Sequence, residues 1–239
     1  GLATTPDAPA ALFWVLACWL AVRNVQDGLA DRRPLVTGVI MGLVLGLGFL
    51  SKYTHVLLLV SYLGFILARR RGWILTHALP MVVVALAVAS PVIIWNQTHD
   101  WASVMHRFVW TQEQAGPSAR NLGALLGGQL LYVSPVVMVL VILAMIHLWR
   151  TRSEPRQLLM AVLTWGPAIA LWLLCTMSRV AEPHWPVPAY LPVLALLGVQ
   201  WERSSPSPGR RKWIAAGRGV AVLFTTLGLL GAATPLATR

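Results

Sequence analysis

The sequence predicts an all-α, polytopic membrane protein with about eight transmembrane helices, on the basis of its composition, its long apolar runs and the charges between them. Of the 239 residues, 57% are apolar and only 11% are charged. Several apolar runs approach the ~20 residues that an α-helix needs to cross a bilayer. This composition excludes an ordinary soluble domain.

The apolar runs define the expected spans, two of which are short for a full crossing. Pro9, Pro188 and Pro192 are expected to start or kink their helices. The eight spans are expected at residues 8–22, 35–50, 54–68, 74–95, 122–149, 157–177, 188–201 and 213–233.

Basic residues gather in alternate loops between these spans. Positively charged loops of membrane proteins stay in the cytoplasm. The net charge of +11 therefore indicates that basic residues are distributed unequally between the loops on the two sides of the membrane. No nucleic-acid partner is expected. The protein is therefore expected in the cytoplasmic (inner) membrane. The loops expected inside carry Arg23, Arg32, Arg33, Arg69, Arg70, Arg71, Arg150, Arg152, Arg156, Arg203, Arg210, Arg211 and Lys212.

The outward side comprises residues 1–7, the turn at 51–54, the long loop at 96–121 and the loop at 178–188. The inner loops are short and carry no recognisable chemistry, so any activity is expected outside. The chain opens at a boundary between a loop and a helix. Residues 1–239 are therefore expected to form a single transmembrane domain, the C-terminal fragment of a larger protein.

The long outer loop is expected to contain a helix that lies along the membrane surface. It begins in "SPVIIWNQTHDWASVMHRF", residues 90–108. Thr98 is expected to cap this helix. Its apolar positions follow the period of an amphipathic helix and are Trp101, Val104, Met105, Phe108 and Val109.

Gly38, Gly42 and Gly46 recur every four residues within one expected span. Small residues at this spacing let two helices approach closely. Packing within the chain is the expected use of this face, and dimerisation is the alternative.

Two charged residues at the edges of expected spans are candidates for the active site. Asp7 in "TTPDAP" also fits a simple helix start, because an acidic residue and Pro9 suit a first turn. Lys52 in "SKYT" lies between two apolar helices, which is costly unless the side chain snorkels or binds an anion. A phosphate carried by a lipid is a natural partner for it. The structural and the functional interpretation both stay open for each residue.

Polar residues in the outer loops are candidates for substrate binding. His99 and Asp100 lie in the long loop, and His184 and Trp185 lie in the stiff segment "AEPHWPVPAY". Trp185 fits either an interfacial aromatic belt or a platform that stacks on a sugar or lipid.

Metal and nucleotide motifs are weak or missing in the sequence. His99, His106 and Glu113 are spaced by seven, whereas zinc ligands on a helix usually come four apart. The cofactor is therefore unknown, with a divalent cation left open. The sequence has no Walker loop, dinucleotide fingerprint or Ser-His-Asp pattern. A substrate that arrives already activated in the membrane fits better.

Four segments in order resemble the protein mannosyltransferase-like bacterial membrane glycosyltransferases. These belong to the GT-C class, together with the aminoarabinose and Rgt-type lipopolysaccharide-modifying transferases. The resemblance covers about residues 1–200. The segments are "TTPDAPAALFWVLACWLAVR", "GLVLGLGFLSKYTHVLLL", "ASPVIIWNQTHDWASVMHRF" and "AEPHWPVPAYLPVLAL".

The resemblance implies an enzyme that takes a sugar from a polyprenyl-phosphate donor. The sugar passes, normally with inversion, to a lipid, glycan or protein acceptor outside the cytoplasmic membrane. Asp7 matches the second acidic position of the family, Lys52 the lysine after the glycine-rich helix, and His184 with Trp185 the polar-Trp pair. The family's first outer loop, with its catalytic acidic pair, is missing here. Asp7 is therefore assigned a supporting role, and the fragment alone is expected to be inactive.

A non-catalytic membrane carrier or flippase component for polyprenyl-linked sugars is the alternative function. Transporters usually place ionisable groups at mid-membrane depth and show internal repeats. The expected spans here are almost free of charge and show no repeat, which favours the enzyme.

The expected orientation predicts which single cysteines a membrane-impermeant thiol reagent reaches in intact cells. Cysteines at Gly116 and Glu182 should react, whereas cysteines at Asp31 and Glu154 should not. The reverse labelling pattern would contradict the orientation and the outward position of the site.

Overall fold

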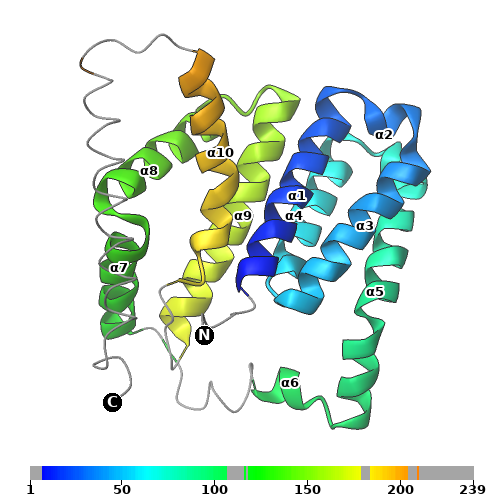
Figure 1. Cartoon of the computed structure of the whole chain (residues 1–239), viewed down its shortest axis with the longest axis horizontal. Coiled ribbons are helices and arrows are strands. Elements are labelled where there is room, and N and C mark those ends of the chain that lie inside the picture. Colours follow the sequence, from blue (N-terminus) through cyan, green and yellow to red (C-terminus); the bar gives the residue numbers. More distant parts are fainter. Residues whose placement is uncertain (1–6, 107–115, 117, 179–183, 204–208, 210–239) are drawn as a thin grey trace.

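The computed structural model describes residues 7–106, 116, 118–178, 184–203 and 209, and the regular structure of this part is helical (Figure 1). In chain order its elements are α1 (Asp7–Gln26), α2 (Leu29–Arg32), α3 (Pro34–Ser51), α4 (His55–Arg69), the π-helix η1 (Ile74–Ala78), α5 (Leu79–Thr98), α6 (Ala102–Met105), α7 (Ala119–Val133), α8 (Pro135–Arg150), α9 (Pro155–Met177) and α10 (Val187–Arg203).

The polytopic membrane architecture is confirmed, but the predicted number of eight spans is wrong. Among the described residues, four stretches are long and apolar enough to cross a bilayer: Asp7–Gln26, Pro34–Ser51, Ile74–Thr98 and Pro155–Met177. The bent pair of α7 and α8 adds a fifth if it is counted as one span. α4, with 15 residues, and α10, with 17, are not among these stretches, although α4 runs from one end of the bundle to the other. The span predicted at 213–233 lies outside the described residues.

The run predicted as one span at 122–149 contains a sharp break. Its two halves are bent by 102° relative to each other. Ser134 has a φ of 68°, and its hydroxyl accepts a hydrogen bond from the amide of Val137 at the start of α8. Pro135 is the first residue of α8, and a proline disfavours helical conformation in the residue before it. The Ser-Pro pair therefore ends one helix and starts the next, which hydropathy alone overlooks.

The glycine face of α3 packs against η1 and α5 of the same chain. A β-carbon added at Gly42 would lie 2.5 Å from the carbonyl oxygen of Met81, and one at Gly46 would lie 2.7 Å from Cβ of Val88. A β-carbon at Gly38 would overlap the backbone of His77. The expectation of packing within the chain is confirmed, and α3 and α5 are held in close backbone contact.

Two groups of helices share one core. One group comprises α1–α5 and the other comprises α7–α10 (Figure 1). The two groups meet where α1 and α4 pack against α9. Trp14, Tyr62 and Phe65 are the bulkiest fully buried side chains of this core. Burial of such aromatic side chains excludes water and fixes the relative positions of the helices that carry them.

A buried polar chain ties four elements together inside the core. Asn24 donates to the Tyr62 hydroxyl at 3.3 Å, and this hydroxyl lies 3.2 Å from Nε2 of His77. Nδ1 of His77 lies 3.0 Å from the Thr37 hydroxyl. Since unpaired buried polar groups are costly, this chain favours one arrangement of α1, α3, α4 and η1.

The two sets of loops lie at opposite ends of the bundle. The start of α1 and the ends of α3 and α5 lie toward the lower part of the view in Figure 1. We call this end of the bundle the site end. At the other end, the basic end, lie α2 and the loops that follow α4 and α8. The alternation of charge in the sequence therefore corresponds to two faces of the molecule.

The helix predicted in the long outer loop is only four residues long in the described part of the chain. Thr98 is the last residue of α5 rather than a cap of the next helix. Asp100 and Trp101 both have positive φ angles, of 50° and 55°, so the chain reverses direction before α6. The Asn96 side chain supports this turn by accepting a hydrogen bond from the Ser103 amide. The predicted positions Phe108 and Val109 lie outside the described residues.

The close contact of α3 with α5 predicts an unusual response to Gly42→Ala. Glycine to alanine inside a helix normally raises stability by up to about 1 kcal/mol, but here the methyl group meets the backbone of Met81. We expect Gly42→Ala to lower the free energy of unfolding by roughly 1–3 kcal/mol. Thermal melting of the detergent-solubilised protein measures this.

The matched control is Gly64→Ala, because no atom lies within 4 Å of a β-carbon at this exposed position in α4. The control should melt at or slightly above the temperature of the parent protein. Equal melting temperatures for the two variants would contradict the close packing of α3 on α5.

Candidate functional site

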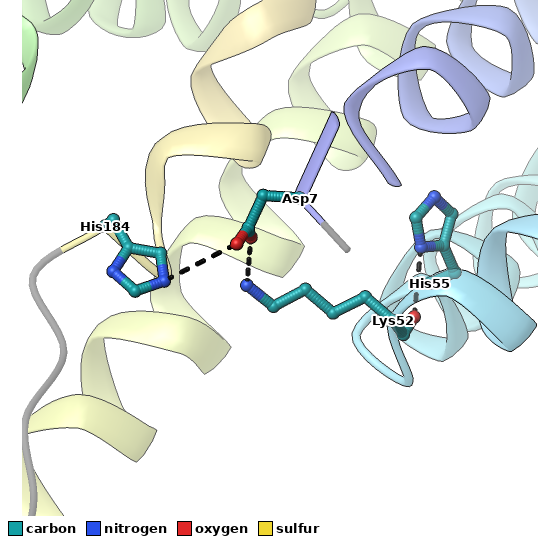
Figure 2. Close-up of polar contacts among 4 residues, drawn as sticks. All are labelled: Asp7, Lys52, His55 and His184. Carbon is teal, nitrogen blue, oxygen red and sulfur yellow. Dashed lines mark hydrogen bonds and ion pairs between the residues drawn. The ribbon is translucent and has the colours of Figure 1, made fainter. Parts of the chain in front are cut away.

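Three residues that are far apart in the sequence meet at the site end (Figure 2). Nζ of Lys52 lies 2.5 Å from Oδ1 of Asp7, and Nε2 of His184 lies 3.9 Å from Oδ2 of the same carboxylate. Asp7 is the first residue of α1, Lys52 follows α3, and His184 precedes α10. We call these three residues the Asp7 cluster. The sequence predicted each of them separately, and the fold brings them together.

The Asp7 cluster is only partly screened from solvent. The exposed fraction of the side chain is 17% for Lys52, 38% for Asp7 and 35% for His184. Charges that are partly removed from water interact more strongly than charges on an open surface. The position of Asp7 in the first turn of α1 is also favourable, because the N-terminus of a helix carries positive partial charge. The cluster is therefore ordered and still accessible to a ligand.

The His184 contact differs in kind from the Lys52 contact. A separation of 3.9 Å is too long for a hydrogen bond. It becomes an attractive ion pair only when the ring is protonated. Lys52 is thus the primary partner of the carboxylate, and His184 lies on its other side.

The backbone around Lys52 is tightly held. Its amide donates to the Gly48 carbonyl at 2.8 Å and ends α3, with φ at −157° and ψ at 125°. Its carbonyl accepts from the His55 amide at 3.1 Å and lies 3.1 Å from Nδ1 of the His55 ring. The lysine therefore emerges from a turn of fixed geometry rather than from a loose loop.

The Asp7 cluster has the chemistry of an anion-binding site. A lysine ammonium has three N–H donors, and the carboxylate of Asp7 accepts one of them. The other two N–H groups of the ammonium can donate to oxygens of a second anion. A phosphate group with several acceptor oxygens is the natural ligand for such an ammonium.

No contact in the described part of the structure joins His99 or Asp100 to the Asp7 cluster. The His99 ring stacks on Trp95 of the same helix at 4.3 Å between centroids, and Nδ1 lies 2.8 Å from the Trp95 carbonyl oxygen. Asp100 is exposed in the turn before α6. Both residues are at the site end, and their predicted role in substrate binding stays a prediction.

Trp185 lies inside the protein, although it is next to His184. Its exposed fraction is 4%, and it packs in a small cluster with Leu125, Cys175 and Trp172. In this position it anchors the segment before α10 against α7 and α9. Its predicted role as a platform for a sugar or lipid stays a prediction.

His55 is a residue at the site that the sequence reasoning did not select. The feature of the sequence that could have identified it is its position three residues after Lys52 in "SKYTH", directly after the tight turn. Its ring is 1% exposed although it begins a helix at the site end.

An apolar cavity lies among the helices that follow α6. It has a volume of about 580 Å³ and lies between α7, α8, α9 and α10. Its lining is almost wholly apolar and includes Tyr190, whose hydroxyl accepts a hydrogen bond from Nε1 of Trp172. Tyr190 follows His184 by less than two helical turns, so the cavity and the Asp7 cluster share the start of α10. A volume of this size suits part of an apolar ligand.

In the described part of the chain, no three side chains of His, Cys, Asp or Glu come together in a group that could hold a metal ion.

The chain is similar to known membrane glycosyltransferases. Residues 1–95, which include Asp7 and Lys52, match the family of dolichyl-phosphate-mannose-protein mannosyltransferases. The chain is 28% identical over 199 residues to the lipid A galacturonosyltransferase RgtD of Rhizobium johnstonii. This similarity covers 80% of the chain and 41% of the relative, so the chain spans about two fifths of that protein's length. No solved structure matches the chain. The resemblance inferred from the sequence is confirmed.

The geometry of the Asp7 cluster predicts that the two charges are energetically coupled. Asp7→Lys alone places two cations together, and Lys52→Asp alone places two carboxylates together. We expect each single variant to melt at a lower temperature than the exchanged variant that carries both substitutions. The coupling energy should be roughly 0.5–1 kcal/mol, since the pair is partly exposed. Recovery should be incomplete, because a lysine is unfavourable at a helix N-terminus.

Thermal melting of the four purified proteins measures the coupling. Strictly additive losses would show that Asp7 and Lys52 do not interact.

Proposed function

Because residues 1–95 match the dolichyl-phosphate-mannose-protein mannosyltransferase family, we propose that the protein is a membrane glycosyltransferase. It transfers a sugar from a polyprenyl-phosphate donor to a lipid, glycan or protein acceptor. Residues 1–239 form a transmembrane domain of a longer enzyme. The single observation that carries this proposal is the Asp7–Lys52 ion pair, which lies within the matched region and at the site end.

Lys52 binds the phosphate of the donor in this proposal. The acceptor oxygen forms a bond to the anomeric carbon of the sugar, and the bond from that carbon to the phosphate oxygen breaks. The bonding electron pair stays on the phosphate, whose negative charge therefore grows as the reaction proceeds. An ammonium group that is already oriented stabilises this developing charge more than the ground state, which lowers the barrier.

Asp7 orients Lys52 rather than acting as the general base. One of its oxygens accepts a hydrogen bond from Lys52, and the other faces His184. Both oxygens of the carboxylate are thus directed at cationic or imidazole partners, which suits a positioning role. The proton of the acceptor hydroxyl is therefore taken by another carboxylate, which we place in the part of the enzyme that carries the catalytic acidic pair of the family.

His184 provides a second cationic group on the far side of Asp7 when its ring is protonated. With Lys52, it would flank an incoming phosphate from two directions. The arrangement thus offers two donors for a dianionic leaving group and one carboxylate that holds them in place.

The apolar cavity supports a lipid-linked donor. It lies between helices of the transmembrane domain and shares the start of α10 with the Asp7 cluster. A donor with a charged phosphate and a hydrocarbon chain would match a charged site beside an apolar one. This pairing favours a membrane-borne substrate over a soluble nucleotide sugar.

The active face lies outside the cytoplasm in this proposal, and the membrane is the cytoplasmic membrane. The support is the set of arginines at the basic end, opposite the Asp7 cluster, because positively charged loops remain in the cytoplasm. The sugar and the acceptor are defined here only by class.

Lys52→Met in the complete enzyme tests the proposal. The substitution keeps an unbranched apolar stem and removes the charge, so folding should survive. A hydrogen bond to a charged group contributes roughly 1.5–3 kcal/mol, so turnover should fall by about ten- to a hundredfold. Lys52→Arg should recover only part of the activity, because a planar guanidinium meets phosphate with different geometry. Release of prenyl phosphate from a prenyl-phosphate sugar donor measures the rate.

Arg120→Met is the matched control, because Arg120 is an exposed cation near the start of α7. This variant should retain the parent activity. Near-normal kinetics of Lys52→Met at normal membrane yield would remove Lys52 from the site. Movement of an intact donor across the membrane without release of prenyl phosphate would identify a flippase instead.

A further inference from the structure

His55 joins the two halves of the Asp7–Lys52 pair without touching either charged group. Its Nδ1 lies 3.1 Å from the carbonyl oxygen of Lys52. A carbonyl oxygen only accepts hydrogen bonds, so Nδ1 must carry the proton in this contact. The ring therefore holds the Lys52 peptide in one orientation, and Figure 2 shows it beside the backbone of that turn.

The same ring packs against the helix that carries Asp7. The centroids of His55 and Trp14 are 5.2 Å apart, with the ring planes at 72°, which is an edge contact. Trp14 is fully buried and lies two turns after Asp7 in α1. Any shift of α1 relative to the Lys52 turn must therefore disturb this contact.

Gly48 makes room for the ring in the last turn of α3. A β-carbon at Gly48 would overlap Cδ2 of His55. The ring is thus enclosed by α1 on one side and by α3 on another, and it is 1% exposed. His55 also lines an apolar cavity of about 210 Å³ between α3, α4 and α5.

The polar character of His55 is not explained by packing alone. Its second ring nitrogen, Nε2, is buried and faces the backbone of Ala10 in α1. The ring thus presents polar atoms both to α1 and to the Lys52 turn. The feature that a phenylalanine could not supply is the hydrogen bond from Nδ1 to the Lys52 carbonyl.

We propose that His55 is a positioning residue that sets the location of the Lys52 ammonium relative to Asp7. It acts through the Lys52 backbone on one side and through Trp14 on the other. The inference rests on the proposed function, in which Lys52 stabilises the departing phosphate. His55 itself is assigned no contact with substrate, because only 1% of the residue is exposed to solvent.

Two substitutions in the complete enzyme separate the hydrogen bond from the packing. His55→Phe keeps a ring of similar size and removes the donor, while the Lys52 carbonyl still accepts from the backbone amide of residue 55. His55→Asn keeps an N–H donor near the position of Nδ1 and loses most of the ring. We expect His55→Phe to melt close to the parent temperature, because it keeps the ring contacts with α1 and α3, and His55→Asn to melt below it.

Activity should follow the opposite order. The kcat of His55→Phe should fall about tenfold or more with little change in KM, because small misplacements of a catalytic group reduce turnover strongly. His55→Asn keeps the donor but loses the ring contact with Trp14, so its kcat should fall less than that of His55→Phe, despite its lower melting temperature. A role in stability alone predicts instead that activity follows melting temperature across the variants.

A double variant tests whether His55 acts through Lys52. In the Lys52→Met background, His55→Phe should cause no further loss of turnover, since the group that it positions is gone. Multiplying losses, or a parent-like kcat for His55→Phe alone, would overturn the positioning role while the proposed function stands. A parent enzyme that releases no prenyl phosphate from the donor would overturn the proposed function, and the role of His55 with it.

Discussion

The ion pair between Asp7 and Lys52 is the interaction on which the rest of the site depends. Its partners lie 45 residues apart in the sequence, at the start of α1 and in the turn after α3. The pair forms only if α1 and α3 are held side by side. Two features do this: the aromatic core around Trp14 and the buried polar chain from Asn24 to Thr37 at the other end of the helices. The glycine face in turn fixes α3 against α5.

The position of this pair also explains why the protein tolerates charge at a membrane boundary. Lys52 is mostly enclosed, and a buried ammonium without a partner would be costly. Asp7 removes that cost while the site is empty of ligand. In the proposed reaction, an incoming phosphate shares the ammonium with the Asp7 carboxylate or displaces that carboxylate. The ammonium of Lys52 therefore always has an anionic partner in its apolar surroundings.

Sequence reasoning identified the parts of the site that lie next to membrane spans. Asp7, Lys52 and His184 were selected because a charge or imidazole at the edge of an apolar helix requires a physical reason, and the fold brings these three together. His55 was overlooked because its role depends on Trp14 and Gly48, whose proximity only the packing reveals. The burial of Trp185 could not be read from its proline-rich segment for the same reason.

The errors in the fold have local causes. Hydropathy averages over many residues, so it joined α7 and α8 across Ser134 and Pro135, where one residue with a positive φ changes the direction of the chain. It also counted α4 as a span, although the helix has only 15 residues. The helical period from Trp101 onward was recognised, but the turn at Asp100 and Trp101, supported by the Asn96 side chain, moved the start of α6 beyond Thr98.

The most direct measurement is an experimental structure of the complete enzyme with a non-hydrolysable polyprenyl-phosphate sugar analogue. The account predicts a phosphate oxygen within about 2.7–3.2 Å of Nζ of Lys52, with Asp7 and His184 beside it and the hydrocarbon chain directed toward the apolar cavity between α7 and α10. A phosphate bound elsewhere, with the Asp7–Lys52 pair unchanged and no ligand oxygen near it, would contradict the central claim.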